Sequence, residues 1–253
     1  MSSEDPRRFF DSADAARWGR GEMPQQGEIT RTWIERANAH GRAIELGCGM
    51  GSLADAASPY VGIDLAFVPL RQLRGRGVQA YMETLPFRDG TFDLVFTWAA
   101  LEHVPQPELV LPEIARVLRP GGVALLAPAW HCRPWAADGL EFRPYSALTL
   151  GQKIRKALIP FRNAILWRSL FELPRRLSRE LRARGGPMRF EYHRLTPNLL
   201  EYVGTDCDAF TSMDPQAMAL YFSTRGWEVL SHPTLRDRML SRSEPVVVRK
   251  PLG

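Results

Sequence analysis

The stretch Ala43-Ile-Glu-Leu-Gly-Cys-Gly-Met-Gly-Ser52 decides the fold, because an apolar strand runs directly into three glycines at alternate positions. A backbone that turns sharply after a strand and brings its amides against a ligand leaves no room for a Cβ atom. Residues 52–57 have helical composition, so the loop is expected to open onto a helix N-terminus with unpaired N–H groups. The stretch therefore predicts a strand, a ligand-binding loop and a helix.

A second strand, ending in Val61-Gly-Ile-Asp64, follows this loop. In parallel sheets ligands bind at the carboxyl ends of the strands, and Asp64 stands at such an end. Its carboxylate can accept hydrogen bonds from both hydroxyls of a ribose. The alternative, a cap for the following helix, is disfavoured by the position directly after the second strand. Together these parts predict a pocket for an adenosine-containing cofactor.

The glycine spacing separates this loop from a nicotinamide-binding loop, which reads G-x-G-x-x-G. Here the spacing is G-x-G-x-G, with Glu45 inside the first strand. This motif resembles that of the class I S-adenosylmethionine-dependent methyltransferases, in particular their small-molecule, type 11-like branch. Residues 83–96, 101–104 and 113–126 resemble later segments of the same branch in the same order. The resemblance covers roughly residues 44–128.

The fold class expected from the resemblance and from the alternation of elements is α/β, a Rossmann-like, doubly wound and mostly parallel seven-stranded sheet. An antiparallel edge strand and a helical lid insertion after strand five complete it. Expected strands are 43–46, 60–64, 78–82, 92–97, 122–127, 227–231 and 245–249, and expected helices are 52–57, 67–74, 107–118 and 214–225.

Three parts are expected along the chain. Residues 1–41 form an N-terminal helical cover, in which the stretch around Arg17 and Trp18 either folds over the pocket or is a loosely ordered leader. Residues 42–130 and 207–253 form the methyltransferase core. Residues 131–206 form a basic amphipathic lid or substrate insertion, because a structureless loop of that length is uncommon in a compact domain.

The resemblance implies a set of residues for the cofactor, S-adenosylmethionine. The first strand and its loop supply Glu45 near the aminocarboxylate group and Gly47, Cys48, Gly49 and Gly51 along the loop. Further along, Asp64 holds the ribose, Leu65 lies against the adenine, Met82 and Glu83 meet the adenine edge, and Thr97 and Trp98 lie near the methionine moiety. The family often has aspartate where this chain has Tyr81. Either Tyr81 or Glu83 replaces that contact, or stacking and backbone hold the adenine.

Methyl transfer from a sulfonium needs alignment and exclusion of water more than chemical assistance. His103 is the first candidate for a general base, since histidine titrates near neutrality. The alternative is that His103 holds its loop in place. Asp206 and Asp208, two apart on a segment expected to be extended, would face the same side. They could bind sugar hydroxyls or accept a proton, or they could cap local turns.

Composition excludes several classes of protein. The 253 residues are 45% hydrophobic, enough for one α/β domain with an insertion. The cysteines, Cys48, Cys132 and Cys207, are far apart and odd in number, so neither a disulfide framework nor a metal site is expected. With no window of eighteen apolar residues and a polar N-terminus, a cytoplasmic protein is expected, with peripheral membrane contact through the lid left open.

The insertion carries the basic charge of the chain. Between His131 and Leu200 there are fourteen lysines or arginines and five acids, whereas the net charge of the whole chain is +5. Apolar residues recur near helical spacing between Leu150 and Leu173, and Pro160 and Pro174 are expected to divide this part into two or three helices. The apolar stripe either docks on anionic lipid or covers the core while the arginines stay in water. The second interpretation is favoured, because such stripes are more often core.

The acceptor predicted from these residues is a hydroxyl group on a glycan, a phosphorylated or lipid-linked sugar, or a related secondary metabolite. Aromatic residues in the insertion suit sugar rings, and arginines suit phosphate or carboxylate. One alternative is C-methylation of a quinone or lipid. The other, a nucleic-acid-binding protein with this fold, is disfavoured because no recognised nucleic-acid motif occurs.

Overall fold

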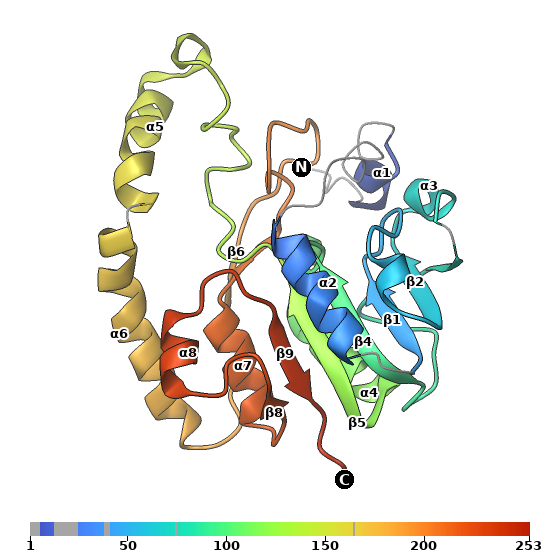
Figure 1. Cartoon of the computed structure of the whole chain (residues 1–253). Helices are drawn as coiled ribbons and strands as arrows, with labels where there is room; N and C mark the ends of the chain where they lie inside the picture. Colours follow the sequence, from blue (N-terminus) through green and yellow to red (C-terminus); the bar gives the residue numbers. More distant parts are fainter. Residues whose placement is uncertain (1–5, 13–24, 38–40, 74, 164) are drawn as a thin grey trace.

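The computed structural model describes residues 6–12, 25–37, 41–73, 75–163 and 165–253 (Figure 1). Arg17 and Trp18 lie outside these described residues. The described part is built around a seven-stranded sheet in the order β3-β2-β1-β4-β5-β9-β8. The strands are β1 (Ala43–Leu46), β2 (Tyr60–Asp64), β3 (Arg76–Gln79), β4 (Phe92–Trp98), β5 (Leu118–Ala127), β8 (Glu228–Val229) and β9 (Val246–Arg249).

The first five strands pair in parallel, and β9 runs antiparallel to both β5 and β8. The predicted mostly parallel sheet with an antiparallel edge pair is confirmed. The strand order reverses between β1 and β4, and at such a reversal a crevice opens above the carboxyl ends of the strands.

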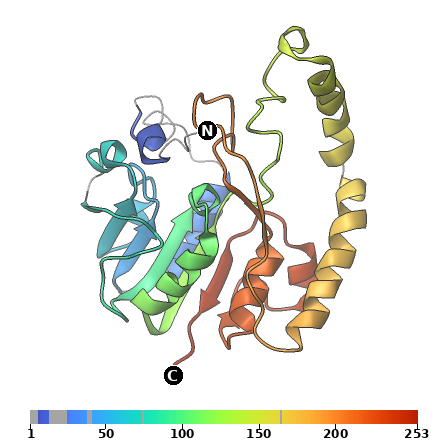
Figure 2. The same cartoon turned by 180° about the vertical axis from the view of Figure 1, so that it is seen from behind.

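Helices cover both faces of the sheet (Figures 1 and 2). On one face α2 (Gln25–Ala37) packs through Ile34 against Leu94, Phe96 and Leu125. On the other, α4 (Pro107–Val117) and α7 (Pro215–Ser223) bury apolar side chains against the alternate strand residues. This division follows from the period of two along a strand, which sends successive side chains to opposite faces.

Two predicted elements differ from the structure. Instead of a helix over residues 52–57 there is one 3-10 turn, Ala54–Ala56, because Pro59 and the start of β2 leave less than two helical turns of chain. The predicted helix over 67–74 is shorter, α3 (Phe67–Leu70). The glycine loop therefore does not open onto the N-terminus of an α-helix.

The insertion forms α5 (Leu150–Asn163) and α6 (Ile165–Ala183), and its returning chain forms a small antiparallel sheet of β6 (Tyr192–Arg194) and β7 (Thr211–Met213). Pro160 and Pro174 lie inside these helices rather than at their ends, so the predicted division at the prolines is wrong. Figure 1 shows α5 and α6 following one another along one side of the molecule, with α6 beside α7 and α8 (Leu235–Leu240).

The favoured interpretation of the apolar stripe is also wrong. On α5, Leu150, Ile154, Leu158 and Phe161 are all at least half exposed, and only Ile159 of its large apolar side chains is buried. On α6 the arginines Arg176 and Arg179, rather than the leucines, are buried against the protein. No helix in the described part of the chain combines the length and the apolar content needed to cross a bilayer.

Candidate active site

The glycine loop after β1 is held tightly against β2. The amides of Gly47 and Cys48 both donate to the carbonyl of Ile63 at 2.9 Å. Gly47 has φ +75°, and a Cβ there would collide with the Cβ of Ala100. Only glycine combines this backbone conformation with so close an approach.

Asp64 is the anchor of the loop. Its Oδ2 accepts from the amide of Gly49 at 2.8 Å, and its Oδ1 accepts from the amide of Ala66 at 2.9 Å. Burial raises the pKa of this carboxyl group, while the two backbone amides act in the opposite direction. A carboxylate offers about four lone-pair positions. Two therefore remain for hydroxyl groups of a ligand.

A pocket of about 430 Å³ opens beside this loop at the carboxyl ends of β1, β2 and β4. Seven of the predicted site residues line it, namely Gly47, Gly49, Asp64, Leu65, Met82, Glu83 and His103. A Cβ on Gly49 would meet nothing within 4 Å, so open space lies directly against the loop. Apolar walls, a partly satisfied carboxylate and this open space fit an adenosine-containing cofactor.

The other predicted cofactor residues, Glu45, Cys48, Gly51, Thr97 and Trp98, are not among the residues lining this pocket. Burial raises the pKa of Glu45 to about 8, although Tyr60 donates to its Oε2 at 2.5 Å and favours the charged form. Cys48 is buried, and the buried Oγ1 of Thr97 has no hydrogen-bond partner among the described residues. Their roles toward the cofactor stay predictions.

Within the expected N-terminal cover, a short helix that the sequence did not single out, α1 (Pro6–Phe10), forms one wall of the pocket. Pro6 and Phe10 line it, and the Phe10 ring meets the His103 ring edge-on with centroids 5.6 Å apart. Asp11 anchors this segment, because its Oδ1 accepts from the amides of Phe67 and Val68 at the start of α3. The only signal in the sequence is the apolar pair Phe9-Phe10 in a polar leader.

The three predicted catalytic residues come together at one end of this pocket. His103 Nδ1 lies 3.3 Å from Oδ2 and 3.4 Å from the carbonyl oxygen of Asp208, 105 residues later in the chain. Its Nε2 lies 3.7 Å from Glu102 Oε1. Burial lowers the pKa of His103, but the negative charges of Glu102 and Asp208 outweigh burial, and the pKa ends above its usual value of 6.5.

Asp206 belongs to the same acidic cluster. Burial raises its pKa, and the charge of His103 acts against that rise. The segment is a turn in which Asp206 has φ +59°, so the predicted extended geometry is wrong. Among the described residues, the non-glycine positions with positive φ are Ala99, His131 and Asp206, each in a loop that borders one of the two pockets or this cluster. Such conformations persist where surrounding contacts hold them, often at functional sites.

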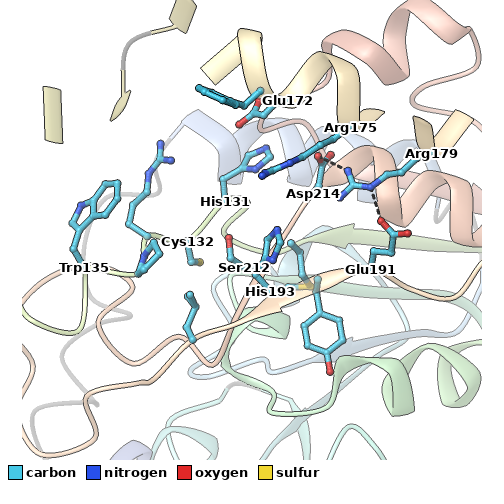
Figure 3. A pocket seen from close by; sticks show the side chains of 16 residues that line it. His131, Cys132, Trp135, Glu172, Arg175, Arg179, Glu191, His193, Ser212 and Asp214 are labelled. Carbon is cyan, nitrogen blue, oxygen red and sulfur yellow. Dashed lines mark hydrogen bonds and ion pairs between the residues drawn. The ribbon is translucent and has the colours of Figure 1, made fainter. Parts of the chain in front are cut away.

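A second pocket, of about 300 Å³, lies between α6 and the β6–β7 sheet (Figure 3). Its lining includes Cys132, which also lies close enough to the acidic cluster to oppose the rise that burial causes in the pKa of Asp206. Four aromatic or histidine side chains line this pocket, namely His131, Trp135, Tyr192 and His193. Trp130, Tyr145 and Tyr202 line neither pocket.

Charged groups from α6 form one side of this second pocket. Arg179 donates to Glu191 at 2.8 Å and to Asp214 at 2.9 Å, and Figure 3 shows these two pairs at one end of the pocket, away from Trp135. Arg175 lies on the same side and is exposed. The sequence could not place Arg179, because its acidic partners lie 12 and 35 residues away. Among the described residues, no three His, Cys, Asp or Glu side chains are placed to hold a metal ion.

Comparison with known proteins agrees with this geometry. Residues 44–126 match the family model of the methyltransferase domain. An uncharacterized methyltransferase of Mycobacterium sp. strain JLS is 37% identical over 111 residues, which are 40% of this chain and 44% of the relative. The ubiquinone biosynthesis O-methyltransferase of Paracidovorax citrulli is 33% identical over 96 residues, 32% of this chain and 40% of the relative.

Among solved structures, the S-adenosylmethionine-bound amino pentose methyltransferase CalS10 of Micromonospora echinaspora aligns with a TM-score of 0.39 and 25% identity, over 46% of this chain and 56% of that chain. The chain thus spans about half, or less, of the length of the relatives it matches. The matched residues contain the glycine loop, Asp64 and His103. Residues 44–126 of this chain are therefore a methyltransferase domain of the class I, S-adenosylmethionine-dependent type, and the cofactor of that domain is S-adenosylmethionine.

Proposed function

We propose that this protein methylates a hydroxyl group of an anionic sugar, such as a phosphorylated or lipid-linked glycan. The observation that carries the proposal is His103, which lines the first pocket and faces Asp208. The first pocket fits the cofactor and the second suits the acceptor. Cys132 of the second pocket lies near Asp206 of the same acidic cluster, so a group able to take a proton lies in the region that joins the two sites in this proposal.

The chemistry that the cofactor supplies when bound is an electrophilic methyl group on a sulfonium, whose leaving thioether is neutral. The protein has to hold the acceptor in line and remove one proton. In this proposal the carbonyl oxygen of Asp208 accepts from His103 Nδ1–H, with the Asp208 carboxylate 3.3 Å away, and Nε2 is then the basic atom. Nε2 of His103 would take the hydroxyl proton as the methyl group passed from sulfur to the acceptor oxygen, which would leave the neutral thioether behind.

The anionic character of the acceptor is inferred from the second pocket. Arg133 and Arg175 line it in addition to Arg179, which is already paired. Guanidinium groups recognise phosphate and carboxylate through paired hydrogen bonds. Trp135 and Tyr192 add aromatic surface of the kind that packs against sugar rings.

The experiment that tests the base is His103→Asn. We expect kcat to fall by roughly 10²- to 10⁴-fold, the usual contribution of general-base catalysis, while affinity for S-adenosylhomocysteine stays within about threefold. In the parent, the rate should rise with pH through a pKa above 6.5, because only neutral His103 can accept the proton. The variant should lose this rise. An unchanged pH profile in the variant would show that His103 merely holds its loop.

The acceptor class is tested with methyl-labelled S-adenosylmethionine and four acceptors: a phosphorylated sugar, a lipid-linked sugar phosphate, a neutral sugar and a short-chain quinone precursor. We expect label in the first two. The second candidate function is methylation of a quinone or lipid. The names of two relatives, the ubiquinone O-methyltransferase and a phthiotriol dimycocerosate methyltransferase of Mycobacterium ulcerans, favour that acceptor class but do not favour C-methylation over O-methylation. Hydriodic acid releases an O-methyl label and leaves a C-methyl label in place, so product analysis separates the two.

A further inference from the structure

Helix α6 is turned with its polar side toward the protein and its apolar side toward solvent. The inward side carries Arg176 and Arg179, whose side chains are 3% and 10% exposed. On the outward side, Leu170, Leu177 and Leu181 are each more than half exposed. A surface helix of a globular protein normally shows the reverse arrangement.

Ion pairs fix this orientation. Arg176 donates to both carboxylate oxygens of Asp214 and to the carbonyl of Met239, while Arg179 also donates to Asp214. From the same side, Glu180 accepts two hydrogen bonds from Arg238 of α8. Rotating the leucines inward would carry Arg176, Arg179 and Glu180 away and leave the largely buried Asp214 and Arg238 without these partners, which is strongly unfavourable. The exposed stripe is therefore a stable property of the fold.

The stripe continues on α5. There the exposed apolar residues, Leu150, Ile154, Leu158 and Phe161, are spaced four, four and three apart and so lie on one side of the helix. On α6 the exposed leucines at 170, 173, 177 and 181 are spaced three, four and four apart. These two sets of residues are called the outer stripe. Figures 1 and 2 show the two helices consecutive along one edge of the molecule.

The charge around the outer stripe indicates what covers it. Between Phe142 and Phe171 the sequence holds six lysines or arginines and no acid. Lys153 and Arg155 are exposed beside the stripe on α5. A second copy of the chain would bring like charge against like charge. An apolar stripe bordered by cations is the pattern of helices that lie in the interface of an anionic bilayer.

We propose that α5 and α6 lie on an anionic membrane surface through the outer stripe. The inference does not depend on the proposed function, because binding to lipid needs no turnover. It does place the second pocket near the bilayer, since Phe171, Glu172, Arg175 and Arg179 of α6 line that pocket.

The test is flotation of the full chain with vesicles of phosphatidylcholine alone or mixed with phosphatidylglycerol. We expect binding to the mixed vesicles, weakened but not abolished by moderate salt, and little binding to phosphatidylcholine alone. The variant Leu170→Gln/Leu177→Gln should lower the vesicle-binding constant by at least about tenfold, since both side chains lose their transfer into the apolar layer. Its thermal stability should match the parent, because both leucines are exposed.

The matched control is Leu109→Gln/Leu252→Gln, which replaces two exposed leucines outside α5 and α6 and should bind vesicles like the parent. Equal binding by the Leu170/Leu177 variant and the parent would overturn the proposal. The proposal would also be overturned if the parent did not bind anionic vesicles but formed a dimer that the Leu170/Leu177 variant did not form. A second copy of the chain would then cover the outer stripe.

Discussion

At the scale of single residues, the site depends on carboxyl groups in different surroundings. Asp64 is held by two backbone amides and keeps lone pairs for a ligand, whereas Glu45 is buried against Tyr60. Asp208 faces a histidine. The surroundings, rather than the residue type, therefore distinguish these three carboxyl groups.

The raised pKa of Glu45 predicts that the free energy of unfolding depends on pH. Its pKa is raised to about 8 in the fold, against 4.5 for an ordinary glutamate, so its contribution is fully present below pH 4.5 and is lost as the pH rises through 8. Glu45→Gln keeps an acceptor for Tyr60 and removes the ionisation. We expect the variant to gain free energy of unfolding relative to the parent between pH 5 and pH 8, on the order of 4 kcal/mol, because the parent loses about 1.4 kcal/mol per pH unit over this interval.

Urea unfolding at the two pH values measures this gain. The exposed Glu201→Gln is the control and should show no such difference between the two pH values. If parent and Glu45→Gln had parallel pH dependence, Glu45 would be ionised in the folded protein.

At the scale of elements, α6 shows how tertiary pairing overrides a helical pattern. Its apolar stripe alone predicts that the leucines face the core. Asp214, the N-cap of α7 whose side chain accepts from the amide of Gln216, instead attracts Arg176 and Arg179. Helix α6 therefore packs against the rest of the protein through the ion pairs of its arginines with Asp214.

Arg176→Met should be costly for this reason. Removing one partner of a buried ion pair typically costs about 3 kcal/mol or more, and we expect a loss of about 3 kcal/mol in the free energy of unfolding. Arg182→Met is the matched control on the same helix, because Arg182 pairs with Glu191 but its side chain is 56% exposed, and its loss should stay below about 1 kcal/mol. Chemical denaturation of both variants compares them. Equal losses would mean that the buried pair does not hold α6 in place.

At the scale of the whole molecule, the acidic cluster is bordered by His103, which lines the first pocket, and by Cys132, which lines the second. α1 and the Asp206 turn come from opposite ends of the sequence and meet around His103. This convergence follows from parallel strand order, which sends every loop after β1, β2, β4 and β5 to the same edge.

A ligand that binds only the folded chain should stabilise all of it. S-adenosylhomocysteine at about one hundred times its Kd should add about 2.7 kcal/mol to the free energy of unfolding and raise Tm. Asp64→Ala should remove most of this shift, because both the ribose acceptor and the contact to Gly49 are lost. Asp55→Ala, which removes an exposed acid just beyond the loop, should leave the shift intact. A full shift with Asp64→Ala would exclude Asp64 as a cofactor ligand.

The sequence by itself determined the sheet, the cofactor family and the glycine loop. These depend on local signals: apolar strands, glycines that alone tolerate positive φ, and an acid at a strand end. Only the tertiary structure decided that His103 meets Asp208, that α1 walls the pocket, and that α6 turns its leucines outward. Each of these rests on partners far apart in the chain, and the energy of a buried charge pair depends on where the fold brings the partners together, which no local pattern encodes.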